Sequence, residues 1–294
     1  MASDNINGRL NRVIAVGNQK GGVAKTTNAV HIASALGERG NRCLIWDLDM
    51  NHGATLHFGI PSESFLGTFE VLIGEKQPED VIITNEDEDV ELPENVHLIA
   101  ARRNLEKIDQ ALIAKNKFLI TQDVLIDPLR TLQGQYDYIF LDTAPNATTP
   151  TIAAYKAAEW FILSAMPDPF AIAGLNDALS DIQDAQQHGN TAIRLLGVIL
   201  SGVDKRTRLA NTLNDYVEQI FSPDGRTSAK FKTNISRSTV VPQAQKLGQT
   251  LFQTYPTHRV TEQYRYLAQE IIERLESFTN SRFPSERQQV KNAR

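Results

Sequence analysis

Two lysines and a pair of glycines near the N-terminus form the pattern with the strongest chemical implication in this sequence. They stand in the run Gly17-Asn18-Gln19-Lys20-Gly21-Gly22-Val23-Ala24-Lys25-Thr26-Thr27. The apolar run Val13–Val16 precedes it, and Thr26–Gly37 follows with apolar residues at helical spacing. A glycine loop between a strand and a helix can wrap its backbone N–H groups around phosphates, and the helix N-terminus adds partial positive charge. The run therefore predicts a phosphate-binding loop.

The second lysine distinguishes this loop from the usual P-loop. The strict pattern G-x-x-x-x-G-K-[ST] is absent because Gln19 and Ala24 stand at its glycine positions. The chain has K-G-G-x-x-K-T-T instead, with Lys20 five residues before Lys25. We interpret it as a deviant Walker A motif, in which Lys25 neutralises the β- and γ-phosphates and the Thr26 hydroxyl completes a Mg²⁺ shell.

Acidic residues end two other apolar runs. Cys43–Trp46 is followed by Asp47-Leu48-Asp49, and Tyr138–Leu141 is followed by Asp142. In open α/β sheets, ligands bind in the crevice at the carboxyl ends of the strands. We therefore expect these carboxylates to lie beside the phosphate loop, where they can hold a metal ion and its water.

Short apolar runs of this kind recur along the chain and alternate with helical patterns. They are Val13–Val16, Cys43–Trp46, Val96–Ala100, Tyr138–Leu141, Trp160–Ser164 and Leu195–Ser201. Nearly continuous apolar runs suit strands that are buried on both faces. The alternation predicts an α/β fold, a doubly wound, mainly parallel sheet flanked by helices. We expect one P-loop domain over residues 12–279, an N-terminal tail over 1–11 and a polar C-terminal tail over 280–294.

Composition limits the class of protein. With 294 residues, 41% of them hydrophobic, and a net charge of -5, the chain is ordinary for a globular protein, and no apolar run approaches the roughly 20 residues of a membrane span. The single cysteine, Cys43, excludes an internal disulfide and a four-cysteine metal site, and it favours a reducing cytoplasm. His52 and His57 lack the ligand spacing of a zinc site, so we interpret them as loop residues.

Taken together, K-G-G-x-x-K-T-T, Asp47-Leu48-Asp49 and Asp142 resemble the motifs of the ParA/MinD superfamily of dimerising ATPases. The resemblance implies that Lys20 reaches across a nucleotide sandwich dimer to the partner's phosphates, that Asp49 positions the attacking water and that Asp142 is the Walker B aspartate. It implies ATP bound by Lys20, Gly21, Gly22, Val23, Ala24, Lys25, Thr26 and Thr27, Mg²⁺ held by Thr26, Asp47 and Asp142, and catalysis by Lys20, Lys25 and Asp49. The loop Met50–Gly53 departs from the family's P-Q-G-N.

The last third of the chain carries a positive charge that fits the same resemblance. Residues 201–250 hold eight Lys or Arg against four Asp or Glu, a net of +4. Asp204–Leu209 resembles the D-x-R-T-x-L stretch of ParA proteins, and Thr233–Ser238 resembles their T-x-I-x-R-N segment, although Val240 and Gln245 depart from the pattern further on. The resemblance implies nonspecific DNA binding, with Lys205, Arg206, Arg208, Lys230, Lys232 and Arg237 as candidates.

The function implied is that of a ParA-type partition ATPase. ATP closes a homodimer on nonspecific double-stranded DNA, and a ParB-like adaptor on a plasmid, a chromosome or another cargo stimulates hydrolysis, so we expect a cytoplasmic, nucleoid-associated protein. ATP is preferred to GTP because the chain has no N-K-x-D segment. The alternative is a MinD-like spatial regulator on a membrane or protein scaffold. Ser281–Val290 has too few apolar residues for membrane docking, and one cysteine excludes a cluster carrier such as nitrogenase iron protein.

Overall fold

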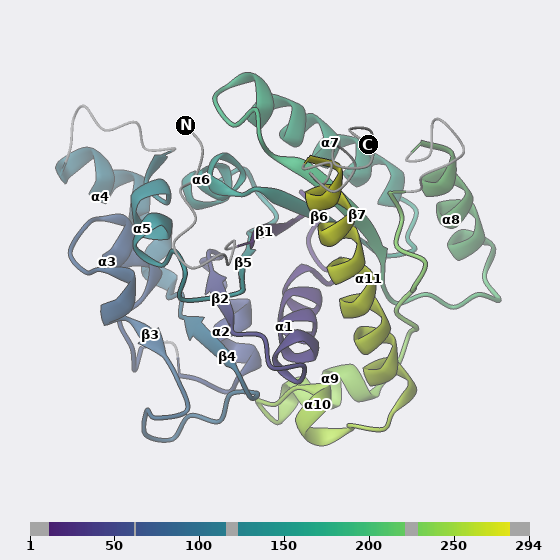
Figure 1. Ribbon diagram of the computed structural model, residues 1–294, viewed down its shortest axis with the longest axis horizontal. Coiled ribbons are helices and arrows are strands. Elements are labelled where there is room, and N and C mark those ends of the chain that lie inside the picture. The colour runs from purple at the N-terminus through teal and green to yellow at the C-terminus, as the bar shows by residue number, and fades with distance from the viewer. Residues whose placement is uncertain (1–11, 62, 116–122, 221–228, 283–294) are drawn as a thin grey trace, which may run out of the picture.

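A seven-stranded sheet runs through the centre of the protein, and helices cover both of its faces (Figure 1). This computed structural model describes residues 12–61, 63–115, 123–220 and 229–282. The strand order is β3-β4-β2-β5-β1-β6-β7, and every pair is parallel except β3 with β4. The strands are β1 (Arg12–Gly17), β2 (Cys43–Asp47), β3 (Ile82–Ile83), β4 (Val96–Ile99), β5 (Tyr138–Asp142), β6 (Trp160–Ala165) and β7 (Arg194–Leu200). The predicted α/β fold is confirmed.

All six predicted strands form, with ends that differ by no more than one residue from those expected. β2, β5 and β6 are buried along their whole length, which is why they appear in the sequence as unbroken apolar runs. The antiparallel edge strand β3 was not predicted, because two residues are too few to produce a recognisable pattern.

The helices form two layers, each with its own part of the hydrophobic core. One layer holds α1 (Lys25–Gly37), α2 (Gly53–His57), α9 (Val240–Lys246), α10 (Leu251–Thr254) and α11 (Arg259–Arg282). The other holds α3 (Thr68–Leu72), α4 (Ile108–Lys115), α5 (Ile126–Thr131), α6 (Thr149–Ala157), α7 (Ala171–Gln187) and α8 (Arg208–Ile220). Two 3-10 turns, Pro78–Asp80 and Arg103–Lys107, complete the described elements.

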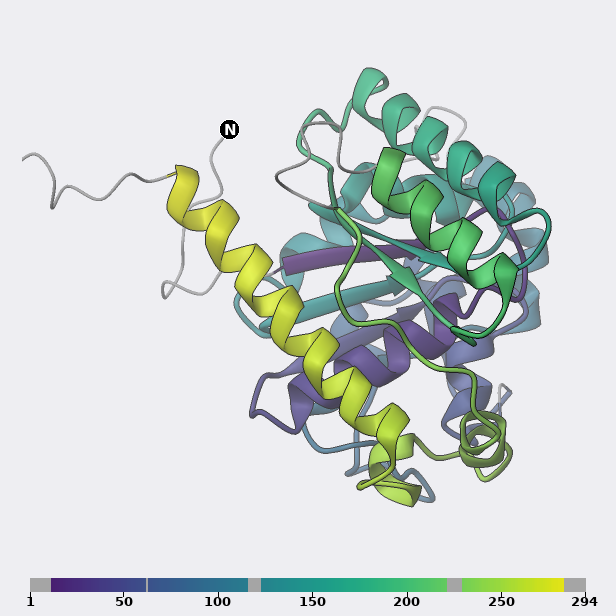
Figure 2. The ribbon, with the colours of Figure 1, turned by 90° about the vertical axis from the view of Figure 1, so that its right-hand side faces the viewer.

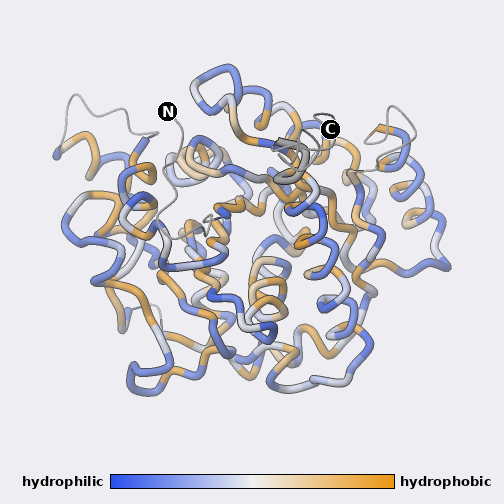
Figure 3. Tube along the Cα trace, viewed as in Figure 1, coloured by the Kyte–Doolittle hydropathy of each residue, from blue (hydrophilic) through white to orange (hydrophobic). Residues whose placement is uncertain are grey.

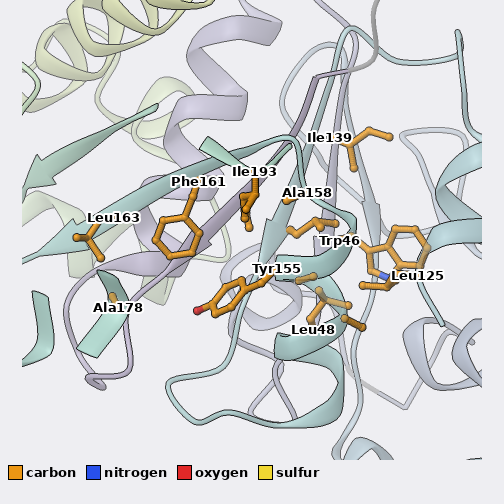
Figure 4. Packing of buried hydrophobic residues seen from close by; sticks show 14 of the residues in the cluster. Trp46, Leu48, Leu125, Ile139, Tyr155, Ala158, Phe161, Leu163, Ala178 and Ile193 are labelled. Carbon is orange, nitrogen blue, oxygen red and sulfur yellow. The ribbon is translucent and has the colours of Figure 1, made fainter. Parts of the chain in front are cut away.

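Apolar side chains fill the space between the sheet and each helix layer. Figure 3 shows hydrophobic residues along the strands and hydrophilic residues on many outer loops. On the α6–α7 side, the ring of Phe161 meets the ring of Tyr155 edge to face, with centroids 5.1 Å apart (Figure 4). Trp46 and Leu163 belong to the same cluster. Burial of these large side chains stabilises the sheet that positions the phosphate loop.

Helix α11 connects the end of the chain to the phosphate-loop helix. It lies beside α1 (Figure 2), and the Tyr264 hydroxyl donates to Asn28 Oδ1 over 2.9 Å. The helix continues to Arg282, three residues past the expected domain end at 279. The remainder of the predicted C-terminal tail, and the N-terminal tail over 1–11, lie outside the described residues. Among the described helices, none combines the length and apolar character needed to cross a membrane.

Two histidines form a buried aromatic group between the phosphate-loop helix and the C-terminal helices. The prediction that His57 is a loop residue is wrong: it lies in α2 and is fully buried, although His52 does lie just before that helix. The His57 ring stands 5.2 Å from that of His31, which stacks on Tyr264 at 4.8 Å. His31 Nδ1 bonds to the Thr27 carbonyl and Nε2 accepts from the Leu251 amide, so the neutral imidazole fits this position.

We expect these buried histidines to lower the free energy of unfolding as the pH falls. Burial lowers the pKa of His31 from 6.5 to about 4, against the opposing effect of the Thr27 carbonyl. Below pH 6.5 the His31 imidazole is protonated in the unfolded chain but stays neutral in the folded chain. The free energy of unfolding therefore falls by on the order of 3 kcal/mol between pH 6.5 and pH 4. Urea unfolding of the His31→Gln variant should show a shallower fall than wild type, whereas exposed His188→Gln should not. Equal slopes in all three proteins would contradict the assignment.

Candidate nucleotide-binding site

A cavity of about 550 Å³ opens at the carboxyl ends of the central strands. Its walls come from the phosphate loop, the loop after β2, the end of β7 and the segment before α9. The lining residues are Gly21, Gly22, Ala24, Lys25, Thr26, Thr27, Asp49, Asn51, Pro145, Met166, Ser201, Gly202, Ile235, Ser236, Arg237, Ser238, Val241, Pro242 and Tyr264. Six of the eight residues predicted to bind nucleotide are among them, and Lys20 and Val23 are not. The size and the mixed lining suit a nucleotide.

The phosphate loop follows β1 and turns into α1 through two left-handed residues. Gly22 has φ +74° and Ala24 has φ +67°. Ala24 stands where the strict P-loop pattern has glycine, and the backbone there does require the left-handed conformation. An alanine in this conformation costs on the order of 1 kcal/mol relative to the right-handed region. The deviant loop therefore keeps the backbone shape of a P-loop at some cost in strain.

Lys25 is the first residue of α1, and its side chain is almost completely buried at the base of the loop. Its ammonium group donates to the Lys20 carbonyl over 3.0 Å. Burial lowers the pKa of Lys25, while the carboxylates of Asp142 and Asp49 oppose the shift. A cation held near two carboxylates and the helix N-terminus is well placed to neutralise a phosphate.

The parallel register brings the predicted acids together. Asp47, the last residue of β2, is paired with Asp142, the last residue of β5, and Asp142 is paired with Val16 of β1, next to the loop. Asp49 follows two residues after Asp47 and lines the cavity, where its carboxylate accepts from the Asn51 amide at 2.9 Å. Asp47 and Asp142 are completely buried.

The two buried acids have different surroundings. Asp47 Oδ2 accepts from both the Thr55 amide and the Thr55 hydroxyl, at 2.9 and 2.8 Å, and Oδ1 accepts from the Asp49 amide at 3.2 Å. Its oxygens are thus occupied in fixing the loop that carries Asp49. Because each carboxylate oxygen can accept more than one bond, these contacts are compatible with metal ligation, and the prediction that Asp47 helps to hold the metal stays a prediction.

Asp142, in contrast, has no well-directed hydrogen bond to either carboxylate oxygen among the described residues. Burial and the nearby Asp47 raise its pKa, whereas the Thr26 hydroxyl and Lys25 oppose the shift. Orphaned oxygens of a buried carboxylate are costly unless a cation completes the site. A Cβ on Gly53 would lie 3.1 Å from Thr26 Oγ1, so the first residue of α2 packs closely against this hydroxyl. Asp142 and Thr26 therefore fit a hard cation that prefers oxygen ligands.

The Lys20 side chain contacts residues that follow β6 and does not line the nucleotide cavity. Its ammonium group forms an ion pair with Asp168, which follows β6, and lies 5.6 Å from the centroid of the exposed Phe170 ring. Its amide donates to Asn18 Oδ1 at 2.9 Å. Lys20 therefore does not line the cavity of its own chain, although the adjacent Gly21 does.

A buried polar network behind the loop was not predicted. Asn28 of α1 donates to Ser164 Oγ at 2.7 Å, and Ser164 donates to the Val23 carbonyl at 2.6 Å. Asn28 Oδ1 accepts from Ser201 and Tyr264, and both of these residues line the cavity. The network ties the phosphate loop to β6, β7 and α11. In the sequence these are isolated polar residues within apolar runs, and only the fold brings them together.

The predicted basic residues fall into different environments. Lys205, Arg206 and Arg237 meet at a second, smaller pocket, and Arg208 begins α8 as an exposed residue. Lys232 is exposed but does not line that pocket. Arg206 is held by Asp204, with Nε–Oδ1 at 2.9 Å and Nη2–Oδ2 at 2.7 Å.

Lys230 has to be removed from the predicted DNA-binding surface. It is buried, and its ammonium group donates to the Phe231 carbonyl at 3.1 Å and lies 3.4 Å from a Glu218 carboxylate oxygen. A buried, paired ammonium group cannot reach a DNA phosphate without breaking these contacts. Conversely, Arg259 at the start of α11 lines the second pocket and was missed, because it stands outside both basic sequence segments.

Comparison with known proteins gives a consistent result. Residues 11–195 match the family model described as "AAA domain". The chain is 31% identical to the chromosome-partitioning ATPase Soj of Thermus thermophilus, an alignment that covers 90% of this chain and 97% of Soj. It is 28% identical to the sporulation initiation inhibitor protein Soj of Bacillus subtilis, over 89% of this chain and 98% of that one.

Solved structures share the same architecture. Cobyrinic acid a,c-diamide synthase from Mycobacterium smegmatis, solved with an ATP analogue and magnesium, superposes with a TM-score of 0.75 at 26% identity, over 91% of this chain and 96% of that one. The septum site-determining protein MinD of Pyrococcus horikoshii, solved with Mg-ADP, has a TM-score of 0.69 at 21% identity, over 89% and 96% of the two chains, and supports the fold alone. The phosphate loop, the sheet and these relatives together show that the chain belongs to the ParA/MinD superfamily of deviant Walker A ATPases.

Proposed function

We propose that this protein is a ParA-type ATPase that binds Mg-ATP, closes as a sandwich dimer and binds nonspecific DNA, so that a cargo carrying a ParB-like adaptor is partitioned or positioned. The observation that carries the proposal is the position of Lys20. Its ammonium group does not line the cavity of its own chain, although the next residue, Gly21, does, and it is paired with Asp168 after β6 instead. A lysine so placed can reach the phosphates of a nucleotide bound by a second subunit, which makes dimerisation part of ATP hydrolysis.

The chemistry assigned to the chain's own residues is mainly positioning and charge neutralisation. Lys25 and the amides of Gly21–Thr27 hold the phosphates, and Asp49, at the cavity wall, orients the attacking water. Mg²⁺ neutralises phosphate charge when it is bound, and the oxygens of Asp142 and Thr26 are the residues that would hold it. The orphaned carboxylate of Asp142 supports this assignment independently of any relative.

Dimer closure has a cost that follows from the ion pair at Lys20. To reach a second subunit, the ammonium group has to leave Asp168 and the Phe170 ring. Both members of the ion pair are partly exposed, so its loss costs little, about 0–1 kcal/mol for a pair of this kind. The contacts of Lys20 with a partner's phosphates can repay this cost, so that ATP favours the dimer.

Nonspecific DNA binding is supported by exposed basic side chains, above all Lys205 after β7 and Arg237 before α9. Phosphate contacts by such residues give affinity without sequence specificity and with strong salt dependence. A MinD-like spatial regulator on a membrane or protein scaffold is the second candidate, and the MinD match supports only the fold that both candidates share. It predicts nucleotide-dependent dimers that bind no DNA.

The first experiment compares the two candidates directly. Binding to random-sequence duplex DNA is measured at about 0.15 M salt with ATP–Mg²⁺, with ADP–Mg²⁺ and without nucleotide, since phosphate contacts depend on salt. Binding with ATP only is expected. Absence of binding in every state, also at lower salt, would exclude a DNA matrix and leave the scaffold alternative.

Loss of Asp49 should separate dimerisation from hydrolysis. In Asp49→Ala the phosphates and the metal keep their ligands but the attacking water is no longer held, so a long-lived ATP dimer with turnover reduced by at least about 100-fold is expected. Size-exclusion chromatography with light scattering and a phosphate-release assay measure both effects. Asp177→Ala, an exposed change on α7, is the control. Wild-type turnover in Asp49→Ala would exclude the assignment.

Asp142→Asn tests the metal site in a way that a structural role cannot imitate. Because burial and the nearby Asp47 raise the pKa of Asp142 and disfavour its charged form, the variant without nucleotide should be more stable to urea than wild type. At the same time, nucleotide affinity should lose its dependence on Mg²⁺. Urea unfolding and nucleotide titration with and without Mg²⁺ check both. A variant that is less stable and still Mg²⁺-dependent would contradict the assignment.

A further inference from the structure

The hydroxyl of Thr55, a fully buried residue of α2, makes two hydrogen bonds whose direction is fixed. It donates to Asp47 Oδ2 over 2.8 Å and accepts from the Ala101 amide at 3.0 Å. A hydroxyl has one proton, and the Ala101 amide can only donate, so the proton has to point at the carboxylate. The Thr55 amide donates to the same Asp47 oxygen at 2.9 Å. Thr55 thus holds one oxygen of Asp47 with two donors.

The other oxygen of Asp47 holds the backbone of Asp49. Asp47 Oδ1 accepts from the Asp49 amide at 3.2 Å. Because Oδ2 is bound twice by Thr55, rotation of the carboxylate away from the Asp49 amide would break buried hydrogen bonds, which is costly. The Asp49 carboxylate is fixed by a second contact, since its Oδ1 accepts from the amide and the side chain of Asn51 at 2.9 and 3.0 Å. A short chain of contacts therefore runs from a buried hydroxyl to an acid that lines the nucleotide cavity.

The segment between Asp49 and Thr55 has little local reason to keep this shape. His52 has φ +44°, in the left-handed region that favours glycine, and helix α2 has five residues and no side-chain hydrogen bond at its N-terminus. A helix this short is not stable without tertiary contacts. Gly53 packs against Thr26 Oγ1, and Thr55 supplies a buried anchor further along the helix. The position of the segment, and of Asp49 within it, therefore depends on tertiary contacts of α2.

Thr68, a second fully buried threonine, contacts Asp47 in a different way. Its hydroxyl donates to the Asp47 backbone carbonyl over 2.6 Å and accepts from Trp46 Nε1 at 3.1 Å. Both threonines thus join the end of β2 to a neighbouring helix, but of the two, Thr55 alone reaches the Asp47 carboxylate. Comparison of the two residues therefore separates support of the strand from orientation of the carboxylate.

We infer that Thr55 is a positioning residue for ATP hydrolysis: by orienting the Asp47 carboxylate, it fixes the backbone of Asp49 and so the place of the attacking water. The inference rests on the proposed role of Asp49 and adds to it a residue that belongs to no motif recognised in the sequence. Thr55 does not line the nucleotide cavity, so its effect should fall on the rate of hydrolysis and not on nucleotide binding.

The first test removes the hydroxyl but keeps the shape of the side chain and the Thr55 amide. In the full chain, Thr55→Val should lower the single-turnover rate of phosphate release from ATP–Mg²⁺ by about 10- to 100-fold, while its affinity for a non-hydrolysable ATP analogue stays within about threefold of wild type. Thr55→Ser, which restores the hydroxyl, should return the rate to within about threefold of wild type. Thr68→Val is the matched control, and it should keep the wild-type rate because the Asp47 carboxylate retains its donors.

Loss of the buried hydroxyl also leaves the Ala101 amide without this partner, so stability has to be separated from positioning. Urea unfolding shows whether each variant is folded under the conditions of the assay. Where Thr55→Val is not folded, Thr55→Cys takes its place: a thiol is a weak donor and a weak acceptor, so the rate should fall by at least about threefold. A wild-type rate in the folded variant would overturn the inference.

A double variant tests whether Thr55 acts through Asp49. In the Asp49→Ala background there is no carboxylate left to position, so the added Thr55→Val change should lower the rate of phosphate release by no more than about twofold. If the two single effects multiply instead, Thr55 acts on another part of the site, and the inference is overturned.

The outcomes separate this inference from the proposed function. If Asp49→Ala loses turnover and Thr55→Val does not, Thr55 is not a positioning residue and the proposed function stands. If Asp49→Ala hydrolyses ATP at the wild-type rate, the assigned role of Asp49 and this inference are both overturned. An equal loss of rate in Thr68→Val, or a loss of analogue affinity in Thr55→Val as large as its loss of rate, would assign Thr55 to general support of the site and also overturn the inference.

Discussion

The in-register parallel pairing of β2, β5 and β1 is the constraint on which the nucleotide site depends. It sets Asp47 beside Asp142 and Asp142 beside Val16, so that two acids and the phosphate loop meet at one edge of the sheet. A slip of one residue in β5 would turn Asp142 to the other face of the sheet and remove it from the loop. Burial of these strands on both faces is what makes such a slip costly.

At this edge of the sheet, buried charged groups of the chain lack partners that a bound ligand could supply. Asp47 is satisfied by Thr55 and the Asp49 amide, whereas Asp142 has orphaned oxygens and Lys25 is buried at the base of the loop. The folded chain bears the cost of these buried charges, and a cation and phosphates would relieve it. Stability without ligand is thus reduced for the sake of binding, as is common at functional sites.

Charged residues outside the nucleotide cavity are also incompletely paired. Lys20 is paired with the half-buried carboxylate of Asp168, and the pocket lined by Asp204, Lys205, Arg206, Arg237 and Arg259 holds more positive than negative charge. Between these features runs the buried network from Val23 through Ser164 and Asn28 to Tyr264. Helix α11 therefore contributes to both the nucleotide cavity, through Tyr264, and the surface proposed to meet DNA, through Arg259.

Local patterns in the sequence were enough to predict the six buried strands, the phosphate loop and the acids at strand ends, because each depends on residues that are neighbours in the chain. The different hydrogen bonding of Asp47 and Asp142 depends on Thr55, which the fold brings to one carboxylate and not to the other. Likewise, burial of Lys230 and His57 and the approach of Arg259 to Arg237 come from packing between distant segments. Tertiary contacts alone decided these features, since side-chain solvation and charge pairing are properties of the assembled surface and not of the local sequence.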